Sequence, residues 1–125
     1  MKTAKDYLEA ANAVVPKISV EAGIAKHVEG NSVFVDVRDS GLIAQTGTIA
    51  GAARIARGMM EFTADPNTPF YNNALEPDAD IVLVCGAGGQ AALAGATLKE
   101  MGYKNISNVG GFNDWKEAGG PTEEG

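Results

Sequence analysis

Hydrophobic residues along the chain follow two periodicities, one typical of amphipathic helices and the other of short buried strands. Helical spacing covers residues 3–15, 20–29, 39–46, 89–101 and 112–118. Apolar runs of strand length occupy residues 17–18, 32–38, 49–55, 81–85 and 106–109. Because strands alternate with helices, the handedness of their connections favours a parallel sheet. We therefore expect an α/β fold, an open parallel sheet of about five strands with helices on both faces.

The first predicted helix precedes the domain and is treated as a separate unit. Residues 1–16 form an amphipathic helical unit, with Thr3 as a plausible N-cap and Pro16 as its end. We expect its apolar stripe to pack on its own domain, and a dimer contact is the alternative. A single domain then covers residues 17–121, and residues 122–125 are expected to be a frayed tail.

The stretch that carries the most chemistry is IVLVCGAGGQAALAGATL, residues 81–98. A buried strand runs into the only cysteine, Cys85, and a glycine-rich loop then leads into a helix. The free amides and dipole at a helix start favour negative charge, and the thiolate is the nucleophilic form of cysteine. We interpret Cys85 as a catalytic nucleophile in an anion-binding loop made of Gly86, Ala87, Gly88, Gly89 and Gln90. The alternative is a buried cysteine at a strand end, with glycines that only make a turn.

Charged residues follow two other predicted strands. Asp36 and Arg38 end the strand at 32–38, at the sheet edge expected to carry Cys85. They are candidate supporting residues, or an ion pair that ties down a loop. Arg54 and Arg57 follow the next strand and could supply the local positive charge that an anionic substrate needs. A role in surface solubility is the alternative for both arginines.

Composition limits the possible partners. The chain has 125 residues, 45% of them hydrophobic, which suits one globular domain. A formal net charge of -6 argues against nucleic acid and anionic membrane surfaces as partners. One cysteine cannot form an internal disulfide, so a reactive thiol predicts a reducing compartment, the cytoplasm. The sequence contains neither a membrane-length apolar run nor a signal-peptide core.

We expect neither a metal site nor another cofactor. Besides Cys85 the chain has one histidine, His27, which has no cysteine or carboxylate at ligand spacing. Two such residues fall short of any recognisable set of metal ligands. His27 is therefore expected to be a surface residue.

Three segments resemble the single-domain rhodanese family of sulfurtransferases. They are FVDVRDS, GTIAGAARIARG and VCGAGGQAALAGATLKEMGYKNISNVGGFNDWKEAGGP, in the family's order, and the resemblance covers about residues 17–121. It implies the rhodanese fold, a persulfide on Cys85, and a supporting role for Asp36 beside the active loop. The chain departs from the family's Cys-x-x-Gly-x-Arg-Ser motif because Gln90 and Ala91 stand where Arg and Ser would be. Ala50 stands where the family has proline.

The predicted function is transfer of a sulfane sulfur through a Cys85 persulfide. The donor would be thiosulfate or a persulfide and the acceptor cyanide or a thiol, so the partners are small sulfur-containing anions or low-molecular-weight persulfides. One alternative is a rhodanese-like persulfide carrier or binding module without turnover. A cysteine-dependent phosphatase or arsenate reductase is less favoured, since such phosphatases need an arginine where this chain has Ala91. The expected oligomeric state is a monomer or a weak dimer.

Overall fold

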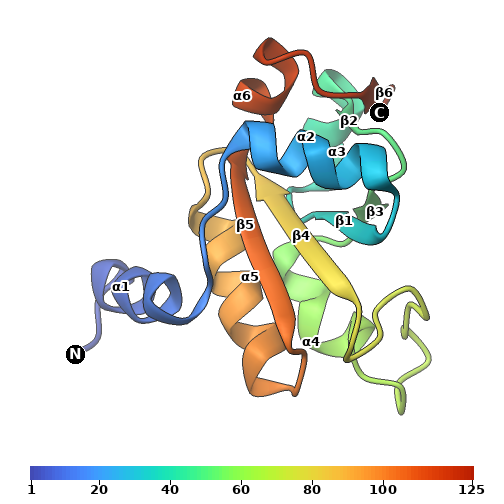
Figure 1. Cartoon of the computed structure of the whole chain (residues 1–125). Helices are drawn as coiled ribbons and strands as arrows, with labels where there is room; N and C mark the ends of the chain where they lie inside the picture. The colour runs from blue at the N-terminus through green and yellow to red at the C-terminus, as the bar shows by residue number, and fades with distance from the viewer.

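The computed structural model describes the whole chain, residues 1–125. Its centre is a four-stranded parallel sheet in the order β3–β1–β4–β5 (Figure 1). In that order the strands span Ala53–Arg54, Ser32–Asp36, Asp80–Cys85 and Asn105–Gly111. The central strand β4 is buried from Ile81 to Cys85, as expected for a parallel strand covered on both faces.

Helices cover both faces of the sheet. On one face α5 (Gly89–Glu100) packs against β4 and β5, and α1 (Ala4–Val14) and α4 (Met60–Thr63) pack against α5 (Figure 1). On the other face α2 (Val20–Glu29) contacts β1 and β5, and α6 (Phe112–Glu117) contacts β5. The remaining helical segments are α3 (Ser40–Thr46) and the short η1 (Arg57–Met59). This arrangement confirms the predicted α/β architecture.

The core consists of two hydrophobic clusters, one on each face of the sheet. Alternate residues of β4 feed them, since Ile81 and Leu83 belong to one cluster and Val82 and Val84 to the other. This alternation is the period-2 pattern of strand side chains. Because both sets are buried, the whole strand reads as one apolar run in the sequence.

His27 lies at the border of this packing and is more enclosed than the surface residue that was expected. It is half-buried, and its ring lies 5.2 Å from that of Phe34 and 6.0 Å from that of Trp115. Its Nε2 lies within hydrogen-bonding distance of the carbonyl oxygen of Ala50, at 2.8 Å. These contacts could not be predicted from helical periodicity, because they join α2 to residues of other elements.

The sheet has four strands, and the fifth element is only a bridge. At the segment predicted as a short strand, Lys17 forms an isolated parallel bridge with Asn108. Pairing goes no further there, because the segment is followed at once by helix α2. The region 49–55, predicted as one strand, splits into β2 (Thr48–Ile49) and β3, and only β3 joins the main sheet. A turn in which the Ala52 amide donates to the Ile49 carbonyl separates the two.

The N-terminal helix begins as predicted. The Thr3 hydroxyl caps α1 by accepting a hydrogen bond from the Asp6 amide, and the Thr3 amide in turn donates to the Asp6 carboxylate. Ala11 is buried and the helix packs on α5, whereas Tyr7 and Val14 stay 54% and 50% exposed. The apolar stripe is thus only partly covered by the chain itself.

The C-terminal segment is not frayed, contrary to expectation. Residues Thr122–Glu123 form β6, which pairs antiparallel with β2. The indole Nε1 of Trp115 donates a hydrogen bond to the Pro121 carbonyl, which anchors the chain just before this strand. The strand could not be predicted from the sequence of this short, acidic segment alone. Its partner strand β2 lies far away in the sequence.

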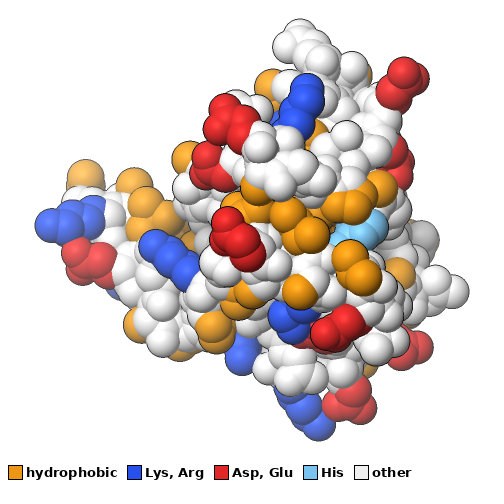
Figure 2. All heavy atoms as spheres, turned by 45° about the horizontal axis from the view of Figure 1, so that its top comes forward, with side chains coloured by type: hydrophobic (Ala, Val, Ile, Leu, Met, Phe, Trp, Pro, Cys, Tyr) orange, Lys and Arg blue, Asp and Glu red, His pale blue; other side chains and the backbone are white.

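Charge is distributed without a basic face in the view of Figure 2. Lys and Arg side chains are scattered there among Asp and Glu, and hydrophobic atoms lie between them. None of the helices has both the length and the hydrophobicity needed to cross a bilayer.

Candidate functional site

The site is built where β4 ends and α5 begins. Cys85 is the last residue of β4 and is only 2% exposed. Its Sγ accepts hydrogen bonds from the amide of Gly88 at 2.9 Å and from that of Ala91 at 3.4 Å. Two backbone donors therefore point at one sulfur atom, an arrangement that stabilises negative charge on it.

The backbone of Gly88 makes this arrangement possible. Gly88 precedes α5 in the left-handed region, with φ of 99°, which residues with a Cβ rarely adopt. No side chain caps α5, so its first amides are free to face the sulfur. Within the predicted loop of residues 86–90, only the Gly88 amide donates to Sγ, and the second donor, Ala91, lies one residue beyond it.

The end of β5 forms the back wall of the loop. A Cβ on Gly111 would lie 2.5 Å from the carbonyl oxygen of Gly86, so no side chain fits at position 111. The side chain of Asn108 also contacts the loop, since its Nδ2 donates to the Gly88 carbonyl at 2.9 Å. Sequence reasoning missed Asn108, because a polar residue inside a short strand carries no signal of the loop it meets.

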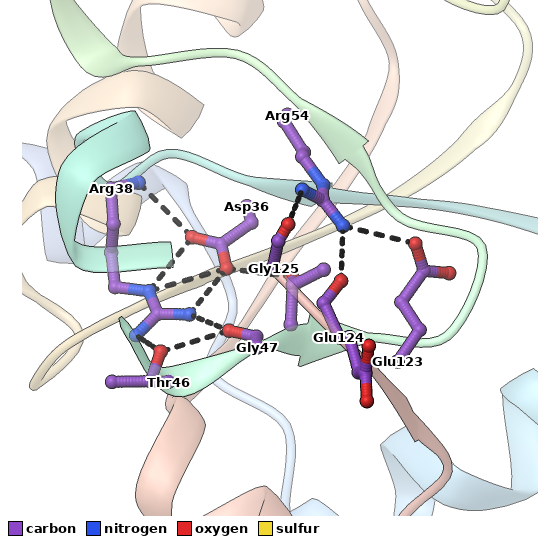
Figure 3. A network of polar contacts seen from close by, with 9 residues as sticks. Asp36, Arg38, Thr46, Gly47, Arg54, Glu123, Glu124 and Gly125 are labelled. Carbon is purple, nitrogen blue, oxygen red and sulfur yellow. Dashed lines mark hydrogen bonds and ion pairs between the residues drawn. The ribbon is translucent and has the colours of Figure 1, made fainter. Parts of the chain in front are cut away.

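Asp36 and Arg38 form a buried ion pair, with side chains 0% and 5% exposed (Figure 3). The Arg38 guanidinium donates from Nη2 and Nε to the carboxylate, and it also donates to Thr46 Oγ1 and the Gly47 carbonyl. The hydroxyl of Thr48 donates to the same carboxylate at 2.7 Å. These contacts match the alternative in which the pair ties down a chain segment after β1.

Arg54 contacts the C-terminal segment of the chain (Figure 3). Its guanidinium donates to the Glu123 carboxylate at 3.1 Å and to the carbonyl oxygens of Glu124 and Gly125. A hydrogen bond from the Gly51 amide and another from Arg54 lower the pKa of Glu123. Arg54 is therefore already paired with an acidic partner in its own chain.

Arg57 lines a groove that is also lined by two residues of the Cys85 loop. Its Nη2 donates to Thr97 Oγ1 on α5 at 3.0 Å, and its Nη1 donates to Glu61 at 3.1 Å. The groove runs between α1 and α5, has a volume of about 970 Å³, and is lined by Arg57, Gly89 and Gln90 among others. Of the three arginines, Arg57 is the one that shares a cavity with loop residues.

The largest cavity lies elsewhere. Its volume is about 1110 Å³, and residues of α3, β3 and the segment 70–73 line it without any contribution from the Cys85 loop. The largest cavity therefore does not mark the position of Cys85. No three His, Cys, Asp or Glu side chains gather as metal ligands would.

The chain belongs to the rhodanese-like domain family, whose model matches residues 22–118. The matched range includes the Cys85 loop, the Asp36–Arg38 pair and the two glycines that end β5. The predicted fold is thereby confirmed at the level of the family as well as of the architecture.

Known proteins similar to this chain differ in their described roles. A Rhodopseudomonas palustris protein of unknown function, described as a possible tyrosine phosphatase, is 36% identical, with a TM-score of 0.91 over 98% of this chain and 96% of that one. The polysulfide-sulfur transferase homodimer of Wolinella succinogenes is 29% identical, with a TM-score of 0.76 over 97% of this chain and 87% of that one.

The curated relative YrkF of Bacillus subtilis (strain 168), whose name describes a proposed sulfur carrier protein, is 30% identical over 103 residues. The match takes in 81% of this chain but only 51% of YrkF, so the chain spans about half the length of that relative.

Proposed function

We propose that this protein is a sulfurtransferase that carries a sulfane sulfur as a persulfide on Cys85. The observation that carries the proposal is the pair of amide hydrogen bonds from Gly88 and Ala91 to Sγ at the start of α5. Donors fixed in advance by the fold stabilise a charged sulfur without reorganising during the reaction. Membership of the rhodanese-like family and the roles described for the Wolinella and Bacillus proteins support the same chemistry.

The proposed reaction has two steps. The Cys85 thiolate attacks the outer sulfur of thiosulfate, the sulfur–sulfur bond breaks, and sulfite leaves with the bonding electron pair. Cyanide or a thiolate then attacks the outer sulfur of the Cys85 persulfide, and the sulfur–sulfur bond breaks. The Cys85 thiolate is regenerated as the leaving group, and the acceptor departs with the sulfur as thiocyanate or as a new persulfide. Charge on Sγ or on the persulfide would be held by the amides of the loop. The chemistry requires reduced Cys85, in keeping with a reducing compartment such as the cytoplasm.

One observation favours a second candidate, a persulfide carrier that turns over poorly with thiosulfate. All three arginines of the chain are held by its own groups, Arg38 by Asp36, Arg54 by Glu123 and Arg57 by Glu61. Gln90, at the mouth of the loop, brings no charge to bind an anionic donor. A low-molecular-weight persulfide carried by a thiol would need that charge less than thiosulfate does.

The geometry gives no support to phosphatase chemistry. A cysteine-dependent phosphatase clamps the phosphoryl oxygens with an arginine six residues after the cysteine. The residue there is Ala91, which is buried and offers its amide to the sulfur.

The test is turnover of thiosulfate with cyanide, followed as sulfite and thiocyanate. The proposal predicts equal amounts of both products from the wild type and none from Cys85→Ser. Thiocyanate formation that persists in Cys85→Ser would contradict the proposal. Sulfur uptake from a thiol persulfide, with little turnover of thiosulfate, would favour the carrier.

A further inference from the structure

A buried asparagine on β5 contacts the Cys85 loop through its side chain. Asn108 is 2% exposed, its Nδ2 donates to the Gly88 carbonyl at 2.9 Å, and its Oδ1 accepts from the Gly110 amide at 2.8 Å. Its backbone amide donates to the Pro16 carbonyl, and its own carbonyl accepts from the Ile18 amide, both at 2.9 Å. Two hydrogen bonds thus orient the side chain, and the two backbone bonds fix the strand that carries it.

A β-bulge sets that orientation. In the pairing of β4 with β5, Leu83 lies opposite Asn108 but Val84 lies opposite Gly110, so Val109 is an extra residue. A bulge bends the strand and redirects the side chains beside it. Here it places the Asn108 carboxamide between the Gly110 amide and the Cys85 loop.

Only Gly88 stands between the Asn108 side chain and the sulfur of Cys85. Asn108 holds the carbonyl of Gly88, and the amide of that same residue donates to Cys85 Sγ at 2.9 Å. Glycine has the widest choice of backbone angles of any residue type, so contacts with other groups must fix the orientation of Gly88. Its carbonyl accepts from the Ala92 amide of α5 at 3.0 Å and from Asn108 Nδ2, and Asn108 is the side chain that holds it, because α5 has no side-chain cap.

We infer that Asn108 is a positioning residue, which aims the Gly88 amide at Cys85 and thereby favours the thiolate and the persulfide. The inference rests on the proposed function only in calling Cys85 the sulfur carrier. Its effect on the thiol itself is independent of the identity of the donor.

The test compares Asn108→Leu with the matched variant Asn105→Leu. Leucine is close to asparagine in size and adds no charge, and Asn105 is an exposed asparagine of the same strand whose Nδ2 donates to the Asp78 carbonyl. Cys85 is the only thiol, so alkylation by iodoacetamide across a range of pH reports on it alone. Melting temperature is measured on the same samples.

We expect Cys85 of Asn108→Leu to be alkylated roughly fivefold more slowly at neutral pH, because the Gly88 amide is no longer held in position to donate to the sulfur. The rate should approach that of the wild type at high pH, where the thiol is ionised in both proteins. Asn105→Leu should follow the wild-type profile throughout. If Asn108→Leu does not fold, Asn108→Ser, whose side chain is too short to reach Gly88, takes its place with the same expectation.

A merely structural role for Asn108 would lower the melting temperature and leave the alkylation profile of the folded variant unchanged. That result would overturn the inference. It is distinguishable from failure of the proposed function, which would be seen in the wild type as a Cys85 thiol that takes up no sulfur.

Discussion

The guanidinium of Arg38 lies 2.7 Å from the carboxylate of Asp36, and both groups are shielded from solvent. Both were candidates for a supporting role at the sheet edge near Cys85. Their contacts with Thr46, Gly47 and Thr48 instead connect the end of β1 to the end of α3 and to the start of β2. The role that these contacts support is therefore structural.

Breaking this pair should therefore cost stability. Arg38→Met should lower the free energy of unfolding by about 3–5 kcal/mol, because it leaves the Asp36 carboxylate buried without its counter-charge. Lys104→Met, which removes an exposed partner of Asp78, should cost less than about 1 kcal/mol. Urea denaturation measures both. A cost for Arg38→Met as small as that for Lys104→Met would show that the pair is dispensable.

The close approach of β5 to the Cys85 loop predicts the effect of a single methyl group. Gly111→Ala would place a Cβ against the Gly86 carbonyl, so we expect a displaced loop, slower alkylation of Cys85 and a loss of about 1–3 kcal/mol in stability. Gly41→Ala in α3 meets open space and should stabilise the fold by roughly 0.5–1 kcal/mol. Unchanged alkylation in Gly111→Ala would mean that the back wall does not shape the loop.

Asp80 at the start of β4 predicts a pH dependence of stability. Partial burial raises the pKa of this carboxyl, but hydrogen bonds from Lys26 and Ser32 outweigh that effect and hold it below its usual 3.8. The ionised carboxylate therefore stabilises the fold at neutral pH, and its contribution is lost as the pH falls through the lowered value.

Asp80→Asn should accordingly cost about 1–2 kcal/mol at neutral pH, and its difference from the wild type should vanish in strong acid. Asp78→Asn is the control, since that side chain is 83% exposed and should matter little at any pH. An Asp80→Asn cost that stays constant from neutral to strongly acidic pH would contradict this account.

The departure from the family motif at Gln90 predicts weak affinity for thiosulfate. Gln90 is exposed on the first turn of α5 and makes no side-chain hydrogen bond. Gln90→Arg should lower the KM for thiosulfate by roughly tenfold, the effect of one charge-assisted hydrogen bond, and added salt should reduce the gain. Gln90→Ala should change little. If the KM did not respond to Gln90→Arg while a thiol-borne persulfide served well, glutamine would be a specificity element.

The sequence predicted the fold and the position of the thiol because both depend on local patterns. The apolar run 81–84 predicts a buried strand, and the glycines after Cys85 predict a loop before a helix. The roles of Arg54 and Asn108 could not be predicted in this way. Each depends on a partner far along the chain, Glu123 for Arg54 and Gly88 for Asn108.

The same reason explains the error about the C-terminal segment and the contacts of His27 that were not predicted. Residues 122–125 look like a loose acidic tail until β2 and Arg54 are placed beside them. The sequence of α2 alone does not show that the His27 ring packs beside Phe34 and Trp115. Periodicity describes a segment on its own, whereas these contacts exist only in the folded chain.

The central claim is that Cys85 accepts a sulfur atom, and the intact mass of the protein tests it most directly. After incubation with thiosulfate or a thiol persulfide, the wild type should gain the mass of one sulfur, and dithiothreitol should remove it. Cys85→Ser should gain nothing. A wild-type mass that stays unmodified under conditions that load an established sulfurtransferase would contradict the account.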